Sequence, residues 1–400
     1  MKSLRRAVAI WALGALAGCN GLIGLKDIYL DDAGAPGERD ATAEGDGGPL
    51  GMDGGAPRDS AMADRTVADA GTDTAPTCTN TVTDDKNCGV CGHDCLGGAC
   101  AGSKCQPAKV ITGQGQPWAI RVDGSSIYWS DIFGSKGTIY KIAKLAVLGA
   151  PIKLAETADP LVYDLVIDGT DVYFSSGSSG NGGFVERVPL SGGTKEVVSP
   201  GADPRGLSID ATRVYWSNGN APTDVLAAAK VADAGSVTLA PAETSPAATF
   251  ADGTRLFWMT SGTLRRCTLP ACADRADMVT GLSGAEGLAT NSTLLFYSTD
   301  NGVFLIAKGA APGPGATVAA MQALPLALAA DEKDVVWANL GFACNSGDIR
   351  RCPITGGAAQ CNATGEVLFT TSNCPRGIAL DAKAIYWTVQ SEGAVYRLAR

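Results

Sequence analysis

Short apolar segments, separated by turn residues, recur along the chain from residue 108 to residue 400. In one such stretch, Trp118–Val122 and Ile127–Trp129 carry apolar side chains in both alternating phases, and the polar turn Asp123–Ser126 lies between them. Apolar runs of this length, bounded by turn residues, predict strands that are buried on both faces. Gly137–Lys141 and Ile152–Leu154 predict two more strands, so the stretch predicts a four-stranded unit.

A proline, an aspartate and an aromatic residue mark each copy of this unit, six residues apart. Five copies keep proline, aspartate and tryptophan: Pro117/Asp123/Trp129, Pro204/Asp210/Trp216, Pro246/Asp252/Trp258, Pro325/Asp331/Trp337 and Pro375/Asp381/Trp387. Two weaker copies are Pro160/Asp168/Phe174, which has a two-residue insertion, and Ala285/Asn291/Tyr297. The seven copies begin 39 to 50 residues apart. This period predicts an all-β, seven-bladed β-propeller of four-stranded blades over residues 108–400, with six blades as the alternative.

The two ends of the repeat region suggest how the ring closes. The seventh copy stops at Arg400, directly after its third strand, Val395–Leu398, while the strand-like segment 109–112 precedes the first copy. We expect segment 109–112 to supply the outer strand of the last blade, because this pairing removes an open sheet edge. The repeated aspartates are expected to form turns by accepting hydrogen bonds from their own backbone.

The N-terminus has the pattern of an export signal. Lys2, Arg5 and Arg6 precede the apolar stretch 7–17, which is too short to span the roughly 30 Å core of a bilayer. The following Leu16–Cys19 resembles the lipobox of bacterial lipoproteins. The resemblance implies that residues 1–18 are removed and that Cys19 is lipidated, which anchors the chain in the outer membrane on its periplasmic or its cell-surface side. Ordinary secretion with a chance cysteine is the alternative.

Residues 19–77 differ in composition from the rest of the chain. Positions 20–77 hold 12 acidic and 4 basic residues and, from Asp31 onward, hardly any large apolar side chain. Such a segment cannot bury enough surface to fold, so it predicts a disordered acidic tether. It also accounts for most of the net charge of −9, so the folded part gives no sign of nucleic-acid binding.

Thirteen cysteines support an oxidising location, because twelve remain once Cys19 is assigned to lipid. Six of them define a small disulfide module over residues 78–107, with pairing left open: Cys78, Cys88, Cys91, Cys95, Cys100 and Cys105. A zinc site formed by Cys88, Cys91, Cys95 and His93 is the alternative. Three further bridges are predicted in the propeller: Cys267–Cys272, Cys352–Cys361 and Cys344–Cys374.

Two motifs carry resemblances to known proteins. The segment Asn87–Cys95 resembles the cysteine-rich segments that precede propellers in predicted lipoproteins of myxobacteria and related soil bacteria, which implies a stalk or adaptor. The sequences Tyr128–Asp131, Tyr215–Ser217 and Tyr386–Thr388 resemble the YWTD repeats of lipoprotein-receptor propellers, which implies the propeller fold. The chain departs from that family by having seven copies, of which one keeps the final aspartate.

Loops that lead into the inner strands, together with loops between second and third strands, gather on one face of a propeller. Ligands usually bind there. The candidate residues on this face are Trp118, Asp131, Arg205, Asn218, Asn220, Glu286, Asp300, Asn301, Asn339, Asn345 and Arg376. The only histidine, His93, lies in the cysteine module, so the propeller has no imidazole for acid–base catalysis. This disfavours the streptogramin-lyase type of seven-bladed enzyme.

These observations predict a lipid-anchored, monomeric, non-catalytic propeller that binds a protein or a glycan and needs no cofactor. The enzymatic alternative is a hydrolase or lactonase of the gluconolactonase type, with Ca²⁺ or Mg²⁺ held by Glu286, Asn218, Asn339 and Asp300. A third hypothesis, by analogy with the propeller lipoprotein of outer-membrane barrel assembly, is an envelope assembly scaffold.

Overall fold

The structure is a computed structural model that describes residues 78–177, 182–284, 286–341 and 344–400. The predicted signal peptide (1–18), the lipidation site Cys19 and the predicted tether (19–77) lie outside the described residues. None of the described residues belongs to a helix that is long and apolar enough to cross a membrane.

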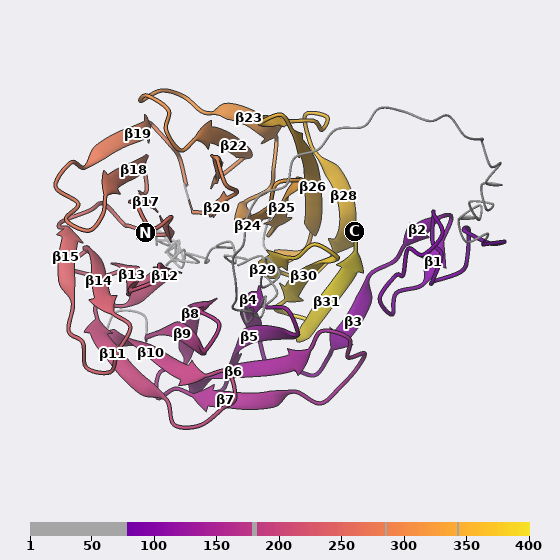
Figure 1. Ribbon diagram of the computed structural model, residues 1–400, viewed down its shortest axis with the longest axis horizontal. Helices are drawn as coiled ribbons and strands as arrows, with labels where there is room; N and C mark the ends of the chain where they lie inside the picture. The colour runs from indigo at the N-terminus through magenta and orange to yellow at the C-terminus, as the bar shows by residue number, and fades with distance from the viewer. Residues whose placement is uncertain (1–77, 178–181, 285, 342–343) are drawn as a thin grey trace, which may run out of the picture. The chain divides into compact units, whose positions relative to one another are not determined.

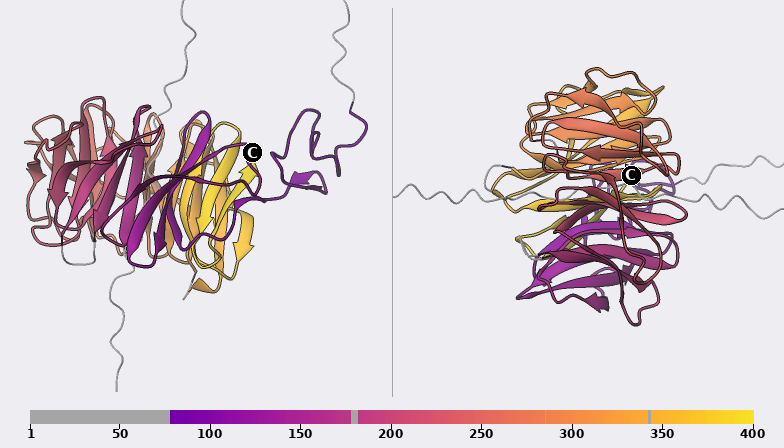
Figure 2. Two further views of the ribbon diagram at one scale, coloured as in Figure 1. Left: turned by 90° about the horizontal axis from the view of Figure 1, so that it is seen from below. Right: turned by 90° about the vertical axis from the view of Figure 1, so that its left-hand side faces the viewer.

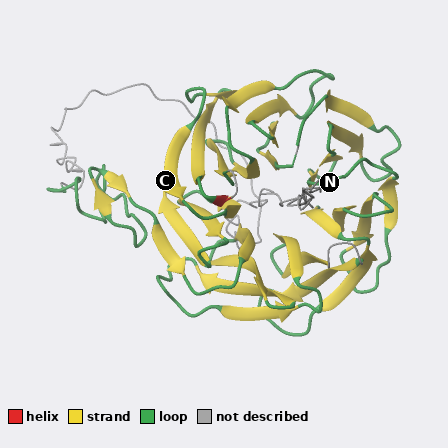
Figure 3. Cartoon of the chain, turned by 180° about the vertical axis from the view of Figure 1, so that it is seen from behind, coloured by secondary structure: helices red, strands yellow, loops and turns green. Residues whose placement is uncertain are grey.

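Seven antiparallel sheets lie around a common centre, which confirms the predicted seven-bladed propeller over the six-bladed alternative (Figure 1). Each innermost strand contacts the innermost strand of the next blade, and that of blade 7 contacts that of blade 1, so the ring is closed. Figure 2 shows neighbouring blades packed against one another. Apart from Cys344, which belongs to a short 3₁₀ helix, the described residues form strands and loops (Figure 3).

The strands of each blade follow one another from the centre outward. Blade 1 contains β4 (Pro117–Val122), β5 (Ser126–Phe133), β6 (Lys136–Ala143) and β7 (Ile152–Glu156), and blade 2 contains β8 (Leu161–Ile167), β9 (Asp171–Gly177), β10 (Gly183–Pro189) and β11 (Glu196–Gly201). Blade 3 contains β12 (Pro204–Ile209), β13 (Arg213–Asn218), β14 (Val225–Ala229) and β15 (Val237–Ala240), and blade 4 contains β16 (Thr249–Ala251), β17 (Arg255–Met259), β18 (Thr263–Thr268) and β19 (Ala276–Thr280). Blade 5 contains β20 (Leu288–Thr290), β21 (Leu294–Thr299), β22 (Gly302–Ala307) and β23 (Ala316–Ala320). Blade 6 contains β24 (Pro325–Ala330), β25 (Asp334–Asn339), β26 (Gly347–Thr355) and β28 (Glu366–Thr371), and the short β27 (Ala358–Ala359) pairs with the end of β26. Blade 7 contains β29 (Pro375–Leu380), β30 (Ala384–Val389), β31 (Ala394–Ala399) and β3 (Ala108–Ile111).

The last blade is closed as predicted. β3 pairs antiparallel with β31, with Lys109 opposite Tyr396 and Ile111 opposite Val395. An ion pair of 2.6 Å between Lys109 Nζ and Glu392 Oε1 supports the same contact. One strand from the start of the domain and three from its end therefore share one sheet.

The repeated aspartates are turn formers, as predicted. In the first copy, Asp123 Oδ1 accepts hydrogen bonds of 2.7 Å from the backbone N–H groups of Ser125 and Ser126, and Oδ2 accepts one of 2.7 Å from the Tyr128 hydroxyl. Burial opposes ionisation of Asp123, but these hydrogen bonds outweigh it and hold its pKa below the usual range. The same backbone bonds recur in the six other copies, at Asp168, Asp210, Asp252, Asn291, Asp331 and Asp381.

The repeat tryptophans fill the spaces between blades. All five, Trp129, Trp216, Trp258, Trp337 and Trp387, are fully buried. Two of them stack on an aromatic residue of the third strand, with ring centroids 5.5 Å apart for Trp129–Tyr140 and 5.4 Å apart for Trp387–Tyr396. This two-sided burial explains why both alternating phases of these strands are apolar.

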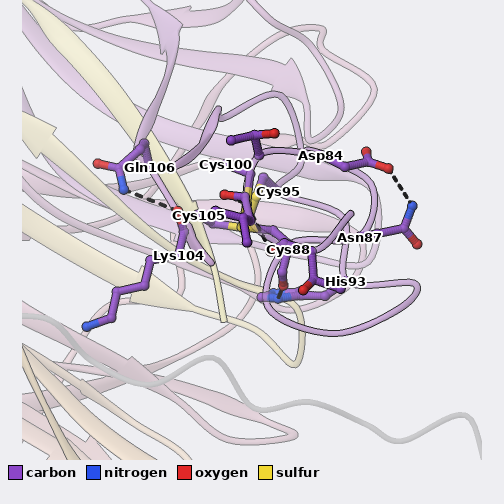
Figure 4. Close-up of a disulfide and its surroundings, with 12 residues drawn as sticks. Asp84, Asn87, Cys88, His93, Cys95, Cys100, Lys104, Cys105 and Gln106 are labelled. Atoms are coloured by element: carbon purple, nitrogen blue, oxygen red, sulfur yellow. Dashed lines mark hydrogen bonds between the residues drawn. A yellow bond between two sulfur atoms is a disulfide. The ribbon is translucent and has the colours of Figure 1, made fainter. Parts of the chain in front are cut away.

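Disulfides hold the cysteine module together, as predicted. Cys88 is bonded to Cys100 and Cys95 to Cys105, next to the short hairpin of β1 (Cys100–Ala101) and β2 (Lys104–Cys105) (Figure 4). Cys78 and Cys91 are disulfide-bonded as well. The sulfur atoms of Cys88, Cys95 and Cys105 lie within 4.8 Å of one another, but each belongs to a disulfide and is not a thiolate ligand for zinc.

The three bridges predicted in the propeller are confirmed: Cys267–Cys272, Cys344–Cys374 and Cys352–Cys361. The first clips the connection between β18 and β19, and the last clips the hairpin of β26 and β27. Cys344–Cys374 joins the loop after β25 to the residue before β29, and so links blades 6 and 7 covalently.

Candidate functional site

The inner strands all begin at the same end of the ring, and the strand registers identify one equivalent residue at each beginning. Pro117 lies opposite Asp131 and Pro204 opposite Asn218, and in both copies the opposite residue comes two positions after the repeat tryptophan. We call the seven equivalent residues the inner-end cluster: Trp118, Tyr163, Arg205, Ala247, Glu286, Leu326 and Arg376.

An arginine and a tryptophan of this cluster form a pair across the junction of blades 7 and 1. Arg376 Cζ lies 4.1 Å from the ring centroid of Trp118. Arg376 Nε donates to Gln390 Oε1 at 2.7 Å, and Gln390 Nε2 donates to Gln116 Oε1 at 2.7 Å. The Thr388 hydroxyl donates to the Trp118 carbonyl at 2.7 Å. These bonds hold the guanidinium over the indole ring, where a cation–π interaction contributes about 0.5–2 kcal/mol.

A second arginine–aromatic pair joins blades 2 and 3. Arg205 Cζ lies 5.1 Å from the ring centroid of Tyr163, and its Nη2 donates to Asp203 Oδ2 at 2.7 Å. Asp203 is fully buried and has a left-handed backbone, with a φ of 60°. Tyr163 was not predicted, because the two-residue insertion in the second copy displaces it from the position after the proline. Asp203 precedes the repeat and carries no sequence signal.

Three other predicted site residues hold loops rather than offer free groups. Asp131 accepts hydrogen bonds from the backbone N–H groups of Gly115 at 3.0 Å and Gln116 at 2.6 Å, and burial raises the pKa of its carboxyl. Asn218 Oδ1 accepts from Ala202 N at 3.1 Å. Asn339 Nδ2 donates to Gln322 Oε1 at 2.9 Å and to Asp348 Oδ1 at 2.7 Å. Each of these three side chains lies at or near the end of a second strand and is at most 3% exposed.

The remaining candidates lie in loops. Asp300 Oδ2 accepts a hydrogen bond of 2.7 Å from the Ser283 hydroxyl. Glu286 and Asn220 are half-buried, and Asn220 donates its backbone N–H to the Ala202 carbonyl. The candidates not yet located, Asn301 and Asn345, are exposed.

The cation ligands predicted for a hydrolase do not form a carboxylate cluster. Among the described residues, the only group of three or more histidine, cysteine, aspartate or glutamate ligand atoms lying within 4.8 Å of one another is the disulfide-bonded set of the cysteine module. Asn218 and Asn339 use their amides to hold neighbouring loops. The two carboxylates of the predicted set, Glu286 and Asp300, belong to no such group.

A buried ion pair links three inner strands. Arg121 Nη2 lies 2.7 Å from Asp164 Oδ1, and the two side chains are 1% and 0% exposed. Asp164 also accepts hydrogen bonds from the backbone N–H groups of Leu165 at 2.8 Å and Leu207 at 2.9 Å, so β4, β8 and β12 meet at one carboxylate. Burial raises the pKa of Asp164 to about 6, against the opposing effect of Arg121.

A comparison with solved structures finds other β-propellers that have a similar fold. A catalytically inactive variant of virginiamycin B lyase from Staphylococcus aureus, crystallised with quinupristin, has a TM-score of 0.57 at 15% identity, and the match covers 74% of this chain and 98% of the lyase. The WD40 propeller domain of Doa1 has a TM-score of 0.52 at 10% identity, with 74% and 97% covered. PorZ, a surface component of the type-IX secretion system of Porphyromonas gingivalis, has a TM-score of 0.52 at 13% identity, with 73% and 38% covered.

No protein-family model matches the chain, and neither does any curated protein sequence. At identities of 10 to 15% the structural likeness shows the β-propeller fold alone. Function therefore has to be argued from the residues of this chain.

Proposed function

We propose that the chain is a non-catalytic binding module, anchored by lipid to the bacterial outer membrane, that binds a protein or a glycan at the inner-end cluster. The observation that carries this proposal is the presence of two arginine–aromatic pairs, Arg376–Trp118 and Arg205–Tyr163, at one end of the ring. Tryptophan, tyrosine and arginine are the residues that most often dominate binding energy at interfaces. Fixed guanidinium groups also lose less entropy on binding than mobile ones do.

The chemistry of the propeller favours binding over catalysis. Residues 108–400 contain no histidine, and several polar side chains near the inner-end cluster already hold loops in place. A general base near neutral pH usually needs an imidazole or a carboxyl whose pKa is raised. Among the described carboxyl groups, that of Asp164 has the most strongly raised pKa, but it is fully buried in an ion pair with Arg121 and lies out of reach of a ligand.

The anchoring part of the proposal rests on Leu16–Cys19 and on the acidic composition of residues 19–77. A flexible tether of this length would let the propeller move on the order of 40 Å from the membrane surface. Replacement of Cys19 by alanine should release the chain from the membrane fraction and abolish metabolic labelling with a fatty acid. Unchanged labelling in Cys19→Ala would refute lipidation at this cysteine.

The binding site is tested with the full mature chain in detergent, on a glycan array and by crosslinking to envelope proteins. Arg376→Ala and Arg205→Ala should each weaken binding about tenfold or more, because each removes one guanidinium from the cluster. Arg351→Ala is the matched control: this arginine pairs with Glu366 at 2.6 Å, between β26 and β28, away from the cluster. Equal loss of binding in all three variants, or none in any, would contradict the assignment of the site.

A thermal melt separates binding from cation-dependent hydrolysis. We expect the same melting temperature in EDTA and in about millimolar calcium or magnesium, whereas a cation at 100 times its dissociation constant would stabilise the fold by about 2.7 kcal/mol. A shift that disappears in Glu286→Ala or Asp300→Ala would favour the hydrolase alternative.

A further inference from the structure

A cavity of about 500 Å³ opens between blades 4 and 5. Its walls are β19 of blade 4, β21 and β22 of blade 5, and the loop Pro312–Gly315. None of the residues of the inner-end cluster lines it. Its volume falls within the range of pockets that hold small ligands, about 300–1,000 Å³.

The equivalent space between blades 6 and 7 is filled by three aromatic rings. Phe369 of β28 packs on both members of the stacked pair in blade 7, with centroids 5.2 Å from Trp387 and 5.0 Å from Tyr396. Trp387 and Tyr396 are themselves 5.4 Å apart with nearly parallel planes. A phenylalanine from one blade and two aromatic residues from the next therefore close this interface.

Smaller residues stand at the same three positions between blades 4 and 5. The strand registers place Val279 where Phe369 stands in blade 6, and place Tyr297 and Phe304 where Trp387 and Tyr396 stand in blade 7. Tyr297 and Phe304 still stack, with centroids 5.4 Å apart. Because valine stands in the place of phenylalanine and tyrosine in the place of tryptophan, the space between blades 4 and 5 is not filled. It remains as the cavity, with the stacked pair Tyr297 and Phe304 on its wall.

The loop Pro312–Gly315 forms one wall of the cavity. Gly313 donates its backbone N–H to the Met278 carbonyl at 2.9 Å, which fastens the loop to β19. A Cβ atom at Gly315 would lie 2.4 Å from the Tyr297 hydroxyl, so only glycine lets the loop pass beside that ring. The loop thus lines the cavity with prolines and glycines, which carry no long side chain able to fill it.

The polar groups that line the cavity suit a ligand that carries hydroxyl groups and no charge. Thr280, Thr299 and Asn301 line it, and within the described part of the chain their side chains make no hydrogen bond. Its one ionisable aspartate, Asp277, is already paired with Arg265 at 2.8 Å. No lysine or arginine is among the described residues that line the cavity, so it offers no countercharge to an anionic ligand.

We propose that this cavity is a binding site for a neutral sugar residue of a glycan, which would place the apolar face of its ring against Phe304 and its hydroxyl groups near Thr280, Thr299 and Asn301. An aromatic wall combined with hydroxyl and amide groups fits a neutral ligand that is apolar on one face and rich in hydroxyl groups at its edge. The site shares no residue with the inner-end cluster, so the inference does not rest on the function proposed there.

Ligand-observed NMR on the full mature chain tests the inference, with glucose, galactose, mannose and N-acetylglucosamine as probes, each at about 10 mM. We expect saturation transfer from the wild type to at least one of them. Val279→Phe introduces the residue found in blade 6 and should reduce the signal at least tenfold without lowering the melting temperature. Val237→Phe, on the exposed side of β15, is the matched control and should leave binding unchanged.

Two further variants keep the test decisive if Val279→Phe does not fold. Asn301→Ala and Thr299→Val each remove one hydrogen-bonding group and should weaken the same sugar several-fold. The inference is overturned if none of the four sugars binds, if a folded Val279→Phe variant binds as the wild type does, or if a proline-rich peptide binds in the cavity instead. Retained sugar binding in Arg376→Ala would show that the two sites are independent.

Discussion

Blades 6 and 7 meet through Phe369, Trp387 and Tyr396, whereas blades 4 and 5 meet through Val279, Tyr297 and Phe304. The backbones follow the same repeat, with the same strand order and the same pairing across the second and third strands. The fold therefore requires an apolar contact between blades but not a complete one. One interface is filled by three aromatic rings, while the other contains the cavity.

The largest expected difference is in the cost of removing the central ring. Trp387→Ala should destabilise the fold by about 3–5 kcal/mol, because it creates a cavity in a filled interface. Tyr297→Ala should cost at least about 1 kcal/mol less, because its ring already borders open space. Urea unfolding followed by circular dichroism measures both. Equal costs would mean that the two interfaces are equally well packed in solution.

The second difference is covalent. Cys344–Cys374 spans 30 residues and joins blades 6 and 7, while Cys267–Cys272 spans 5 residues inside blade 4. Replacing the first pair with serines should cost about 2–4 kcal/mol, and replacing the second pair should cost less, because a longer closed loop restricts the unfolded chain more. The same unfolding measurement applies, and a larger loss from the short bridge would contradict the expectation.

A third interface, between blades 1 and 2, differs from the two aromatic ones because it contains an ion pair, Arg121 with Asp164. Burial raises the pKa of Asp164 from 3.8 to about 6 in the folded chain, so the folded state holds this proton more tightly than the unfolded state does. The resulting stability is fully present below about pH 4 and is lost as the pH rises through about 6. Tyr297 and Tyr396 of the aromatic interfaces also have a raised pKa, but it lies above 10, so these interfaces do not titrate between pH 4 and pH 6.

Asp164→Asn isolates this effect, because asparagine does not titrate. The stability advantage of the wild type over Asp164→Asn should be larger at pH 4.5 than at pH 7.5, by on the order of 2 kcal/mol. Unfolding in urea at the two pH values gives the difference directly. An advantage that grows with pH would show that Arg121 keeps the Asp164 carboxylate ionised throughout.

The smallest expected effect comes from filling the open interface. Val279→Phe combined with Tyr297→Trp gives blades 4 and 5 two of the three residues of the closed interface, and should raise stability by about 1 kcal/mol. Thermal unfolding of the double variant checks this. A lower melting temperature would show that the loop Pro312–Gly315 cannot accommodate the larger rings.

Much of the fold was predictable because the residues that determine each blade lie within one copy of the sequence repeat. The turn aspartates, the buried tryptophans and the seventh blade follow from residues within one copy, and the closing strand follows from the missing fourth strand at Arg400. The three propeller disulfides also follow from local spacing and from elimination.

The site was predictable only in part, because its contacts join different copies. Trp118, Arg205 and Arg376 follow from their place after a repeat proline, but Tyr163 is displaced by an insertion. Arg121 and Asp164 occupy different repeat positions, so no single copy indicates that they meet. The cavity depends on residues of two blades at once, and a small residue in one copy is informative only when its neighbour is known.

The pairing of β3 with β31 has a consequence for the order of folding. A chain that emerges from the ribosome N-terminus first exposes β3 before all seven inner strands, and its partner β31 follows the last of them. Sheet formation between segments so far apart in sequence is slow, because the intervening chain must be ordered before the contact is gained. Completion of blade 7 therefore has to wait for β31, and chains truncated before β31 leave β3 without its partner strand.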